Sequence, residues 1–125
     1  MDILNETGTD VYRELPVCVI SITFIKMMYR VKQLDQFSVW LKGLKDELTR
    51  QRLVNRLRKA TLGNLGDVQA VGGGVFEMRE HFGAGWRMYF IKHGDVLIIM
   101  LGGGTKSSQQ ADIAKAIELA TTLEE

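Results

Sequence analysis

The chain has 125 residues, of which 46% are hydrophobic and 25% are charged, a composition typical of a globular protein with one domain and a modest core. Its single cysteine, Cys18, excludes a disulfide framework and a four-cysteine zinc site, and it indicates a reducing compartment such as the cytoplasm. No apolar run approaches the roughly 18 residues that a membrane-spanning helix needs, so we expect no membrane partner.

The net charge of +1 hides an uneven distribution along the chain. Residues 28–106 carry thirteen basic and seven acidic side chains, whereas residues 1–27 and 107–125 are both net negative. A basic middle favours a polyanionic partner such as a nucleic acid. Random clustering of charge on a solvated surface explains the distribution equally well, so charge alone leaves both interpretations open.

The first 27 residues differ from the rest of the chain. Acidic residues precede the apolar stretch LPVCVISITFI, and no cleavage pattern of small residues follows it, which argues against a signal peptide. Two interpretations remain. In the first, which we favour, translation begins at Met27 or Met28. In the second, Val17–Phe24 is an additional strand that pairs with the sheet. We therefore treat residues 1–27 as an extension and residues 28–125 as the domain.

Residues 36–62 show a helical pattern. Five apolar residues share one helical stripe: Phe37, Trp40, Leu41, Leu44 and Leu48. Leu53, Leu57 and Ala60 continue a stripe at a shifted phase, and the shift near residues 46–49 predicts two helices in a hairpin. Five cations form a dense basic surface on the second helix: Arg50, Arg52, Arg56, Arg58 and Lys59. The glycine-containing sequence GNLGD ends the helices.

The remaining sequence predicts strands and then a helix. Val75–Phe82 and Trp86–Lys92 alternate in polarity, and Val96–Leu101 is a continuous apolar run typical of a central strand. Ser107 and Gln110 have the spacing of a capping box before a final amphipathic helix. The predicted fold class is α+β, with an N-terminal helical hairpin packed on a small antiparallel β-meander and a C-terminal helix.

The first two of these strands form a hairpin in which side-chain parity decides which residues meet. A three-residue loop, Gly83–Gly85, predicts these cross-strand pairs: Phe82 with Trp86, Met78 with Phe90, Arg79 with Tyr89, and His81 with Arg87. One face is then aromatic and sulfur-rich. The other face gathers Glu77, Arg79, His81, Arg87 and Tyr89. We interpret it as an electropositive hollow with proton-transfer groups, although a plain solvated sheet face has the same pattern.

The sequence GGGTKSS, which contains Lys106, resembles a phosphate-binding loop between a strand and a helix. The Walker pattern requires glycine where this chain has Met100 and Thr105, which argues against nucleotide hydrolysis. Glycine-freed backbone amides and a lysine near a helix N-terminus still suit an anionic group. The two histidines and Cys18 have no companions at metal-ligand spacing, so we expect no metal site.

Several motifs occur in a characteristic order: FSVWLKGLKD, then RLVNRLRKATLGNLGDVQAVGGGVFEMREHFGAGWRMYF, then LIIMLGGGTKSSQQADIAKAIELA. Over Tyr29–Leu123 the chain resembles the RelE/ParE superfamily of bacterial toxins, and within it the addiction-module killer proteins near the HigB branch. The resemblance implies the toxin of a type II toxin–antitoxin system. Many relatives are ribosome-dependent mRNA endonucleases, or mRNA interferases, whereas the ParE branch poisons DNA gyrase.

The resemblance also implies roles for individual residues. By position, Arg79, Arg87 and Lys106 correspond to the basic residues that assist attack of a ribose 2′-hydroxyl on the adjacent phosphate. Glu77 or His81 would act as the base and His81 or Tyr89 as the acid. Six cations would hold the RNA backbone: Arg50, Arg52, Arg56, Arg58, Lys59 and Lys92. Such chemistry uses the RNA 2′-hydroxyl, and we expect no cofactor.

The resemblance further implies partners. We expect a cognate antitoxin from the adjacent gene, with a helix-turn-helix domain, alongside mRNA and the ribosome, and DNA contact only through the antitoxin complex. Two other functions stay open: a non-catalytic, ParE-like toxin that binds DNA gyrase, and a degenerate product that binds only its antitoxin and DNA.

Overall fold

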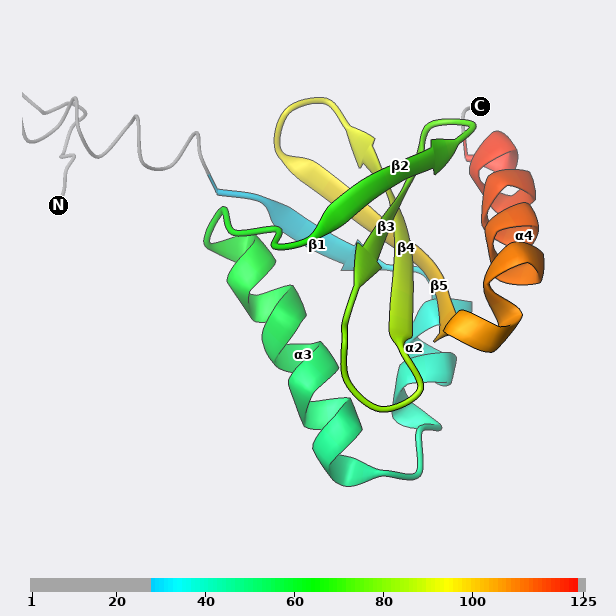
Figure 1. Ribbon diagram of the computed structural model, residues 1–125. Coiled ribbons are helices and arrows are strands. Elements are labelled where there is room, and N and C mark those ends of the chain that lie inside the picture. The colour runs from blue at the N-terminus through cyan, green and yellow to red at the C-terminus, as the bar shows by residue number, and fades with distance from the viewer. Residues whose placement is uncertain (1–27, 124–125) are drawn as a thin grey trace, which may run out of the picture.

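The computed structural model describes residues 28–123, so the predicted strand Val17–Phe24 lies outside the described residues (Figure 1). Its elements in chain order are β1 (Arg30–Gln33), α2 (Asp35–Lys42), α3 (Glu47–Thr61), β2 (Val68–Gly72), β3 (Val75–Arg79), β4 (Trp86–His93), β5 (Leu97–Thr105), the 3-10 helix η1 (Lys106–Ser108) and α4 (Gln109–Thr122). None of the helices in this range is long and apolar enough to cross a membrane.

The strands form one five-stranded sheet in the order β1-β5-β4-β3-β2. Neighbouring strands from β2 to β5 are antiparallel, whereas β1 pairs with β5 in parallel. The predicted α+β class is confirmed, and so is the antiparallel meander, but the whole sheet is mixed. Helices α2 and α3 carry the chain from β1 at one edge to β2 at the other edge, so β1 pairs with β5, the last strand, and not with the strand that follows it in the sequence.

Strand β2 was not predicted from the sequence. Its signal is the short alternation VQAV, which ends in the glycines Gly72, Gly73 and Gly74. All three have positive φ, which glycine adopts without steric strain, and they turn the chain back into β3. The antiparallel pairing of β2 with β3 has a register irregularity between Ala70 and Gly72.

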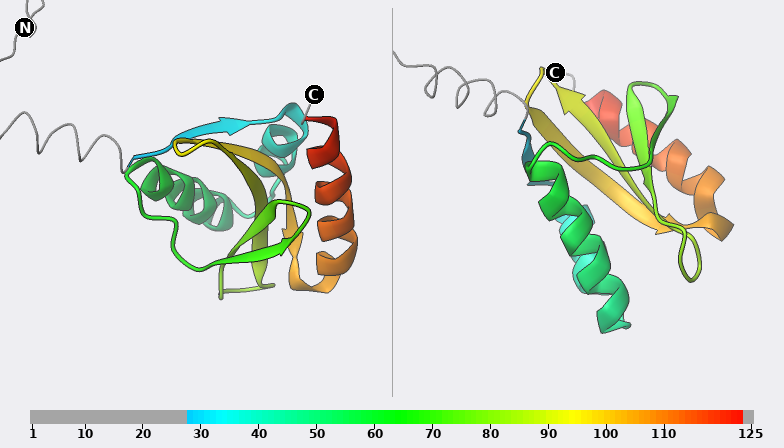
Figure 2. Two further views of the ribbon diagram at one scale, coloured as in Figure 1. Left: turned by 90° about the horizontal axis from the view of Figure 1, so that it is seen from above. Right: turned by 60° about the vertical axis from the view of Figure 1, so that its left-hand side comes forward.

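Helices cover both faces of the sheet (Figure 2). On one face, the predicted stripes of α2 and α3 pack against strand residues in a core that contains Phe37, Leu41, Leu53, Leu57, Met78, Met88 and Phe90. On the other face, α4 packs against a second apolar cluster that contains Val75, Tyr89, Leu101, Ala116 and Ala120. Leu48, which belongs to the predicted apolar stripe, is 58% exposed because it lies in the first turn of α3, beyond the break between the helices.

The predicted break between the two helices is confirmed. It falls between Lys42 and Glu47, and Asp46 caps α3. The Asp46 carboxylate accepts hydrogen bonds from the Thr49 backbone N–H at 3.2 Å and from its hydroxyl at 2.6 Å. These bonds lower the pKa of Asp46, so the cap is charged at neutral pH and complements the N-terminal dipole of the helix.

The structure changes the interpretation of the sequence GGGTKSS in two respects. Gly102, Gly103 and Gly104 belong to β5 and pair with β4, so they form no phosphate-binding loop. Two of these positions require glycine, because a Cβ on Gly103 would collide with the indole of Trp40, and a Cβ on Gly104 would collide with the carboxylate of Asp112. The capping box is also shifted by two residues, since Thr105 and Ser108, not Ser107 and Gln110, make the reciprocal bonds.

Candidate functional site

The β3–β4 hairpin sets the geometry of the candidate site. Glu77 pairs with Tyr89, and Arg79 pairs with Arg87. The predicted parity is therefore confirmed, but the predicted register is wrong by two residues. The ladder continues through the bond from the Glu80 N–H to the Trp86 carbonyl, at 2.9 Å, which leaves residues 81–85 as the loop instead of three glycine-rich residues.

The Glu77–Tyr89 pair is sealed inside the protein. Glu77 is 2% exposed and Tyr89 is 0% exposed. The Tyr89 hydroxyl donates to Glu77 Oε2 at 3.1 Å, and the side-chain amide of Gln109, the first residue of α4, donates to the same oxygen at 2.8 Å. Burial and the neighbouring Glu77 charge raise the pKa of Tyr89 well above its ordinary value. Neither side chain reaches a substrate on the surface in this arrangement.

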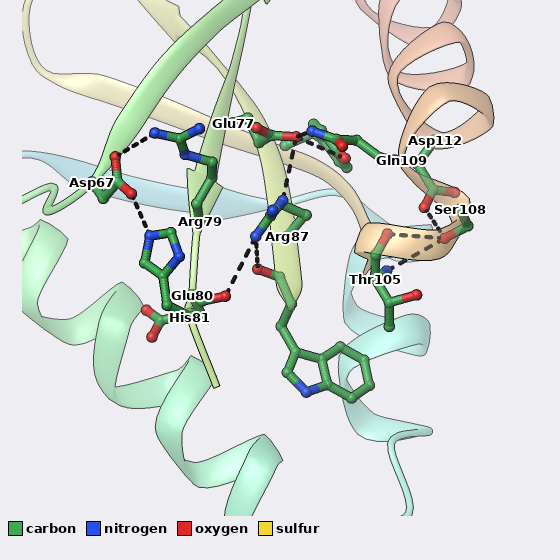
Figure 3. Close-up of polar contacts among 12 residues, drawn as sticks. Asp67, Glu77, Arg79, Glu80, His81, Arg87, Thr105, Ser108, Gln109 and Asp112 are labelled. Carbon is green, nitrogen blue, oxygen red and sulfur yellow. Dashed lines mark hydrogen bonds and ion pairs between the residues drawn. The ribbon is translucent and has the colours of Figure 1, made fainter. Parts of the chain in front are cut away.

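Arg87 lies at the boundary of the sealed region and is 7% exposed. Its Nε lies 3.8 Å from Glu77 Oε2, and its Nη1 donates over 3.4 Å to each of the carbonyls of Glu80 and Trp86 (Figure 3). Nε is buried without a hydrogen-bond partner. A guanidinium carries five N–H donors, so Arg87 retains donor capacity that a bound anion could use.

The Arg79 side chain lies on the same face and is 32% exposed. Its Nη2 donates to Asp67 Oδ1 at 3.1 Å, while its Nε is buried without a partner. The other carboxylate oxygen, Asp67 Oδ2, lies 2.7 Å from His81 Nε2 (Figure 3). The bonds from His81 and Arg79 lower the pKa of Asp67. The His81 side chain is 69% exposed and is free to meet a substrate.

Lys106 lies next to the hairpin loop. Its backbone N–H donates to the Ala84 carbonyl at 3.3 Å. A Cβ on Gly85 would lie 3.2 Å from Lys106 Cβ and 3.9 Å from Arg87 Nη1, so the backbones of the loop and of η1 meet beside the Arg87 guanidinium. Lys106 itself is exposed. The structure therefore brings Arg79, His81, Arg87 and Lys106 to one end of the sheet face covered by α4.

The predicted RNA-binding cations divide into different groups. Arg56 is 9% exposed and forms an ion pair with Glu80, and it donates to the backbone carbonyls of Leu65, Asp67 and Arg79 at 2.9 to 3.1 Å. It therefore holds the fold together and does not reach RNA. Arg50 is partly buried and donates to the Leu44 carbonyl at 2.6 Å.

The remaining cations are exposed. On α3 they are Arg52, Arg58 and Lys59. The Arg52 guanidinium lies over the Phe82 ring, 4.6 Å from its centroid, which links α3 to the hairpin loop. Lys92 lies over the Phe76 ring at 5.0 Å, at the opposite end of β4 from Arg87. Lys92 is therefore remote from the other candidate residues.

Asp67 is a residue of the candidate site that sequence reasoning missed. It follows α3 in the sequence GNLGD, directly before β2, where we considered only the glycines. A carboxylate between a basic helix and a strand was its only local signal. Within residues 28–123, no three His, Cys, Asp or Glu side chains gather in a way that could hold a metal ion.

Comparison with known proteins identifies a relative. No family model matches the chain. An uncharacterized protein of Haemophilus influenzae (strain Rd) is 37% identical to it over 97 residues, which cover 78% of this chain and 98% of the relative. Identity at this level over nearly the whole relative shows common descent. The chain belongs to the same family as this Haemophilus influenzae protein.

Proposed function

We propose that the protein is the toxin of a bacterial type II toxin–antitoxin system and acts as an mRNA interferase with a RelE/ParE-like arrangement of helices and sheet. The observation that carries this proposal is the cluster of polar residues at one end of the sheet face that α4 covers. There, Arg79 and Arg87 are direct cross-strand partners. The exposed His81 lies next to them and contacts the Asp67 carboxylate. The ordered sequence motifs support the same function.

The chemistry follows from these groups. Attack of a 2′-hydroxyl on the adjacent phosphate forms an O2′–P bond and places extra negative charge on a pentacoordinate phosphorus. The fixed guanidinium groups of Arg79 and Arg87 stabilise that charge. His81 takes the proton of the 2′-hydroxyl and returns it to the 5′-oxygen as the P–O5′ bond breaks. The products are a 2′,3′-cyclic phosphate and a 5′-hydroxyl.

Burial reduces the set of proton-transfer groups. Glu77 and Tyr89 were candidates from the sequence, but both are sealed under α4 and bonded to each other. We therefore assign the proton transfer to His81. Glu77 and Tyr89 support the position of Arg87, since the Glu77 carboxylate lies 3.8 Å from its guanidinium.

The surroundings of the site suit a translated message in the cytoplasm. The exposed cations Arg52, Arg58 and Lys59 on α3 would hold the phosphate backbone by charge. An antitoxin from the adjacent gene would neutralise the toxin by covering the basic face, so the free toxin is the active species.

The alternative function, a non-catalytic ParE-like toxin that binds gyrase, has one structural observation in its favour. Three apolar side chains of the helical hairpin are exposed: Val39 by 71%, Leu48 by 58% and Val54 by 48%. Single exposed apolar residues are common on protein surfaces, and these three would support gyrase binding only as parts of one association surface. In that function, toxicity depends on the helices and not on Arg79 or His81.

Mapping of transcript 5′-ends after induction of the gene tests the proposal. The wild-type protein should create new 5′-ends inside translated messages, and the Arg79→Ala variant should create none. Arg30→Ala is the matched control, because Arg30 is an exposed arginine on β1, at the far side of the sheet. Intact messages together with a DNA-damage response would instead support gyrase binding. Intact messages with normal growth would point to the degenerate product.

We expect Arg87→Ala to abolish growth arrest as well. Because Arg87 is 7% exposed and bonded to backbone carbonyls, its loss also affects the fold. The variant therefore needs a thermal unfolding measurement and an antitoxin-binding assay alongside it. A folded Arg87→Ala protein that still arrests growth would contradict the assignment.

A further inference from the structure

The Asp67 carboxylate bridges two residues of the candidate site. Its Oδ1 accepts a hydrogen bond from Arg79 Nη2 at 3.1 Å, and its Oδ2 lies 2.7 Å from His81 Nε2. Asp67 comes from the segment between α3 and β2, whereas its two partners come from the β3–β4 hairpin. One carboxylate thus fixes a cation and an imidazole relative to each other.

The backbone of Asp67 is itself held firmly. Its carbonyl accepts one hydrogen bond from Arg56 Nη2 at 2.9 Å and another from the Arg79 backbone N–H at 3.0 Å. Arg56 also donates to the Arg79 carbonyl at 2.9 Å, so one buried guanidinium ties both segments together. Gly66, with φ of 71°, lets the chain pass close to that guanidinium, because a Cβ there would lie 2.8 Å from Arg56 Nη2. The carboxylate therefore stands on a rigid support.

The bond between Asp67 and His81 has a chemical consequence for the imidazole. An ionised carboxylate only accepts hydrogen bonds, so the ring nitrogen facing it must carry a proton. The pKa of Asp67 is lowered by its bonds, which keeps it ionised at neutral pH. In neutral His81 the proton is then on Nε2, and the lone pair is on Nδ1. Glu80, the neighbouring carboxylate, is already paired with Arg56.

We propose that Asp67 is a positioning residue of the ribonuclease site, which keeps the proton of neutral His81 on Nε2, leaves Nδ1 as the atom that takes the 2′-hydroxyl proton, and holds Arg79 beside Arg87. The inference rests on the proposed function. It gives a role to a residue for which the resemblance implied none, and it names the reacting atom of the base.

The tautomer of His81 can be measured without any RNA. In a long-range proton–nitrogen NMR spectrum at about pH 9, where imidazoles are neutral, His81 should show the Nε2–H tautomer alone. His93, exposed at the end of β4, is an internal reference and should show a mixture of both tautomers. In Asp67→Ala, the His81 signals should move to the mixture that His93 shows.

The kinetic test uses single-turnover cleavage of a message on ribosomes. Asp67→Ala should slow cleavage roughly a hundredfold through misplacement of His81 and Arg79, with little change in RNA affinity. If Asp67 acts through His81, a double Asp67→Ala, His81→Asn variant should be only slightly slower than His81→Asn alone. Asp95→Ala, which removes an exposed carboxylate in the β4–β5 turn, is the matched control and should cleave normally.

The outcomes separate the two proposals. A wild-type protein that cuts no RNA overturns the proposed function and, with it, the role of Asp67. Wild-type cleavage that Asp67→Ala leaves unchanged overturns the positioning role alone. A wild-type His81 ring with the same tautomer mixture as His93 also overturns it.

Discussion

The Glu77–Tyr89 pair and the Arg79–Arg87 pair are neighbours on the same face of β3 and β4, yet their surroundings differ sharply. Helix α4 begins at Gln109, whose side chain bonds to Glu77 and closes the first pair off from solvent. The second pair lies beyond that contact, and Arg79 and His81 remain accessible there. A difference of two residues along the strands thus separates polar groups that stabilise the fold from polar groups that can meet a substrate.

Burial of a charged group is tolerated when it is paired and hydrogen-bonded. Glu77 meets this condition through Tyr89, Gln109 and Arg87. Arg87 meets it only in part, because its contacts are long and its Nε has no partner. Arg87 therefore connects the two pairs, with one side stabilised by the sealed carboxylate and with donors left for an anion.

The largest effect should come from His81, the exposed residue that shares the Asp67 carboxylate with Arg79. His81→Asn should lower RNA cleavage by about 10²–10⁴-fold, the usual contribution of a general base, because His81 is the exposed proton-transfer group that the Asp67 carboxylate contacts. Thermal unfolding should be unaffected, since the side chain is exposed. Single-turnover cleavage and a melting curve measure both properties. Normal cleavage by His81→Asn would remove the basis for the assignment.

The next largest effect should come from Arg56, the buried arginine that holds the backbone of Asp67 and Arg79. Arg56→Leu should lower the free energy of unfolding by about 3–5 kcal/mol, because it breaks a buried ion pair and leaves Glu80 without its partner. Arg58→Leu, an exposed arginine on the same helix, should change it by less than about 0.5 kcal/mol. Urea denaturation compares the two variants. Equal stabilities would mean that Arg56 does not hold these two segments together.

The sealed pair should affect stability more than cleavage. Tyr89→Phe removes a hydrogen bond to a buried carboxylate, so it should lower the free energy of unfolding by about 1–3 kcal/mol. RNA cleavage by the folded variant should remain within a few-fold of wild type. A cleavage loss as large as that of His81→Asn would mean that α4 opens to expose Tyr89 during the reaction.

The smallest effect should come from the exposed face of α3. Arg58→Ala should weaken RNA binding similarly for all sequences and reduce the slope of log affinity against log salt concentration by about 1. The cleavage rate of bound RNA should not change. Filter binding across a salt series measures the slope, and an unchanged slope would place the RNA elsewhere.

These comparisons also show what the sequence could predict. Strand alternation correctly placed Glu77, Arg79, Arg87 and Tyr89 on one face. It could not give the register, because a five-residue loop and a three-residue loop preserve the same parity. Nor could it show that α4 covers Glu77 and Tyr89, because the amphipathic pattern of a helix does not indicate which surface the helix packs against.

The basic residues of α3 are a case in which a usable signal was present. Arg56 falls three residues after Leu53 and four before Ala60, which places it on the buried stripe and not on the outer face. Grouping it with Arg52 and Arg58 by charge alone concealed that position. Asp67 was harder to find, because its partners are 12 and 14 residues away in the chain and meet it only in the folded sheet.

The central claim is that this group of residues cuts RNA through the ribose 2′-hydroxyl, and one substrate tests it directly. A translated message with a single 2′-deoxy nucleotide on the 5′ side of a mapped cleavage site should stay intact at that site. The all-ribose message should be cut there to give a 2′,3′-cyclic phosphate. Cleavage of both messages at equal rates would contradict the mechanism.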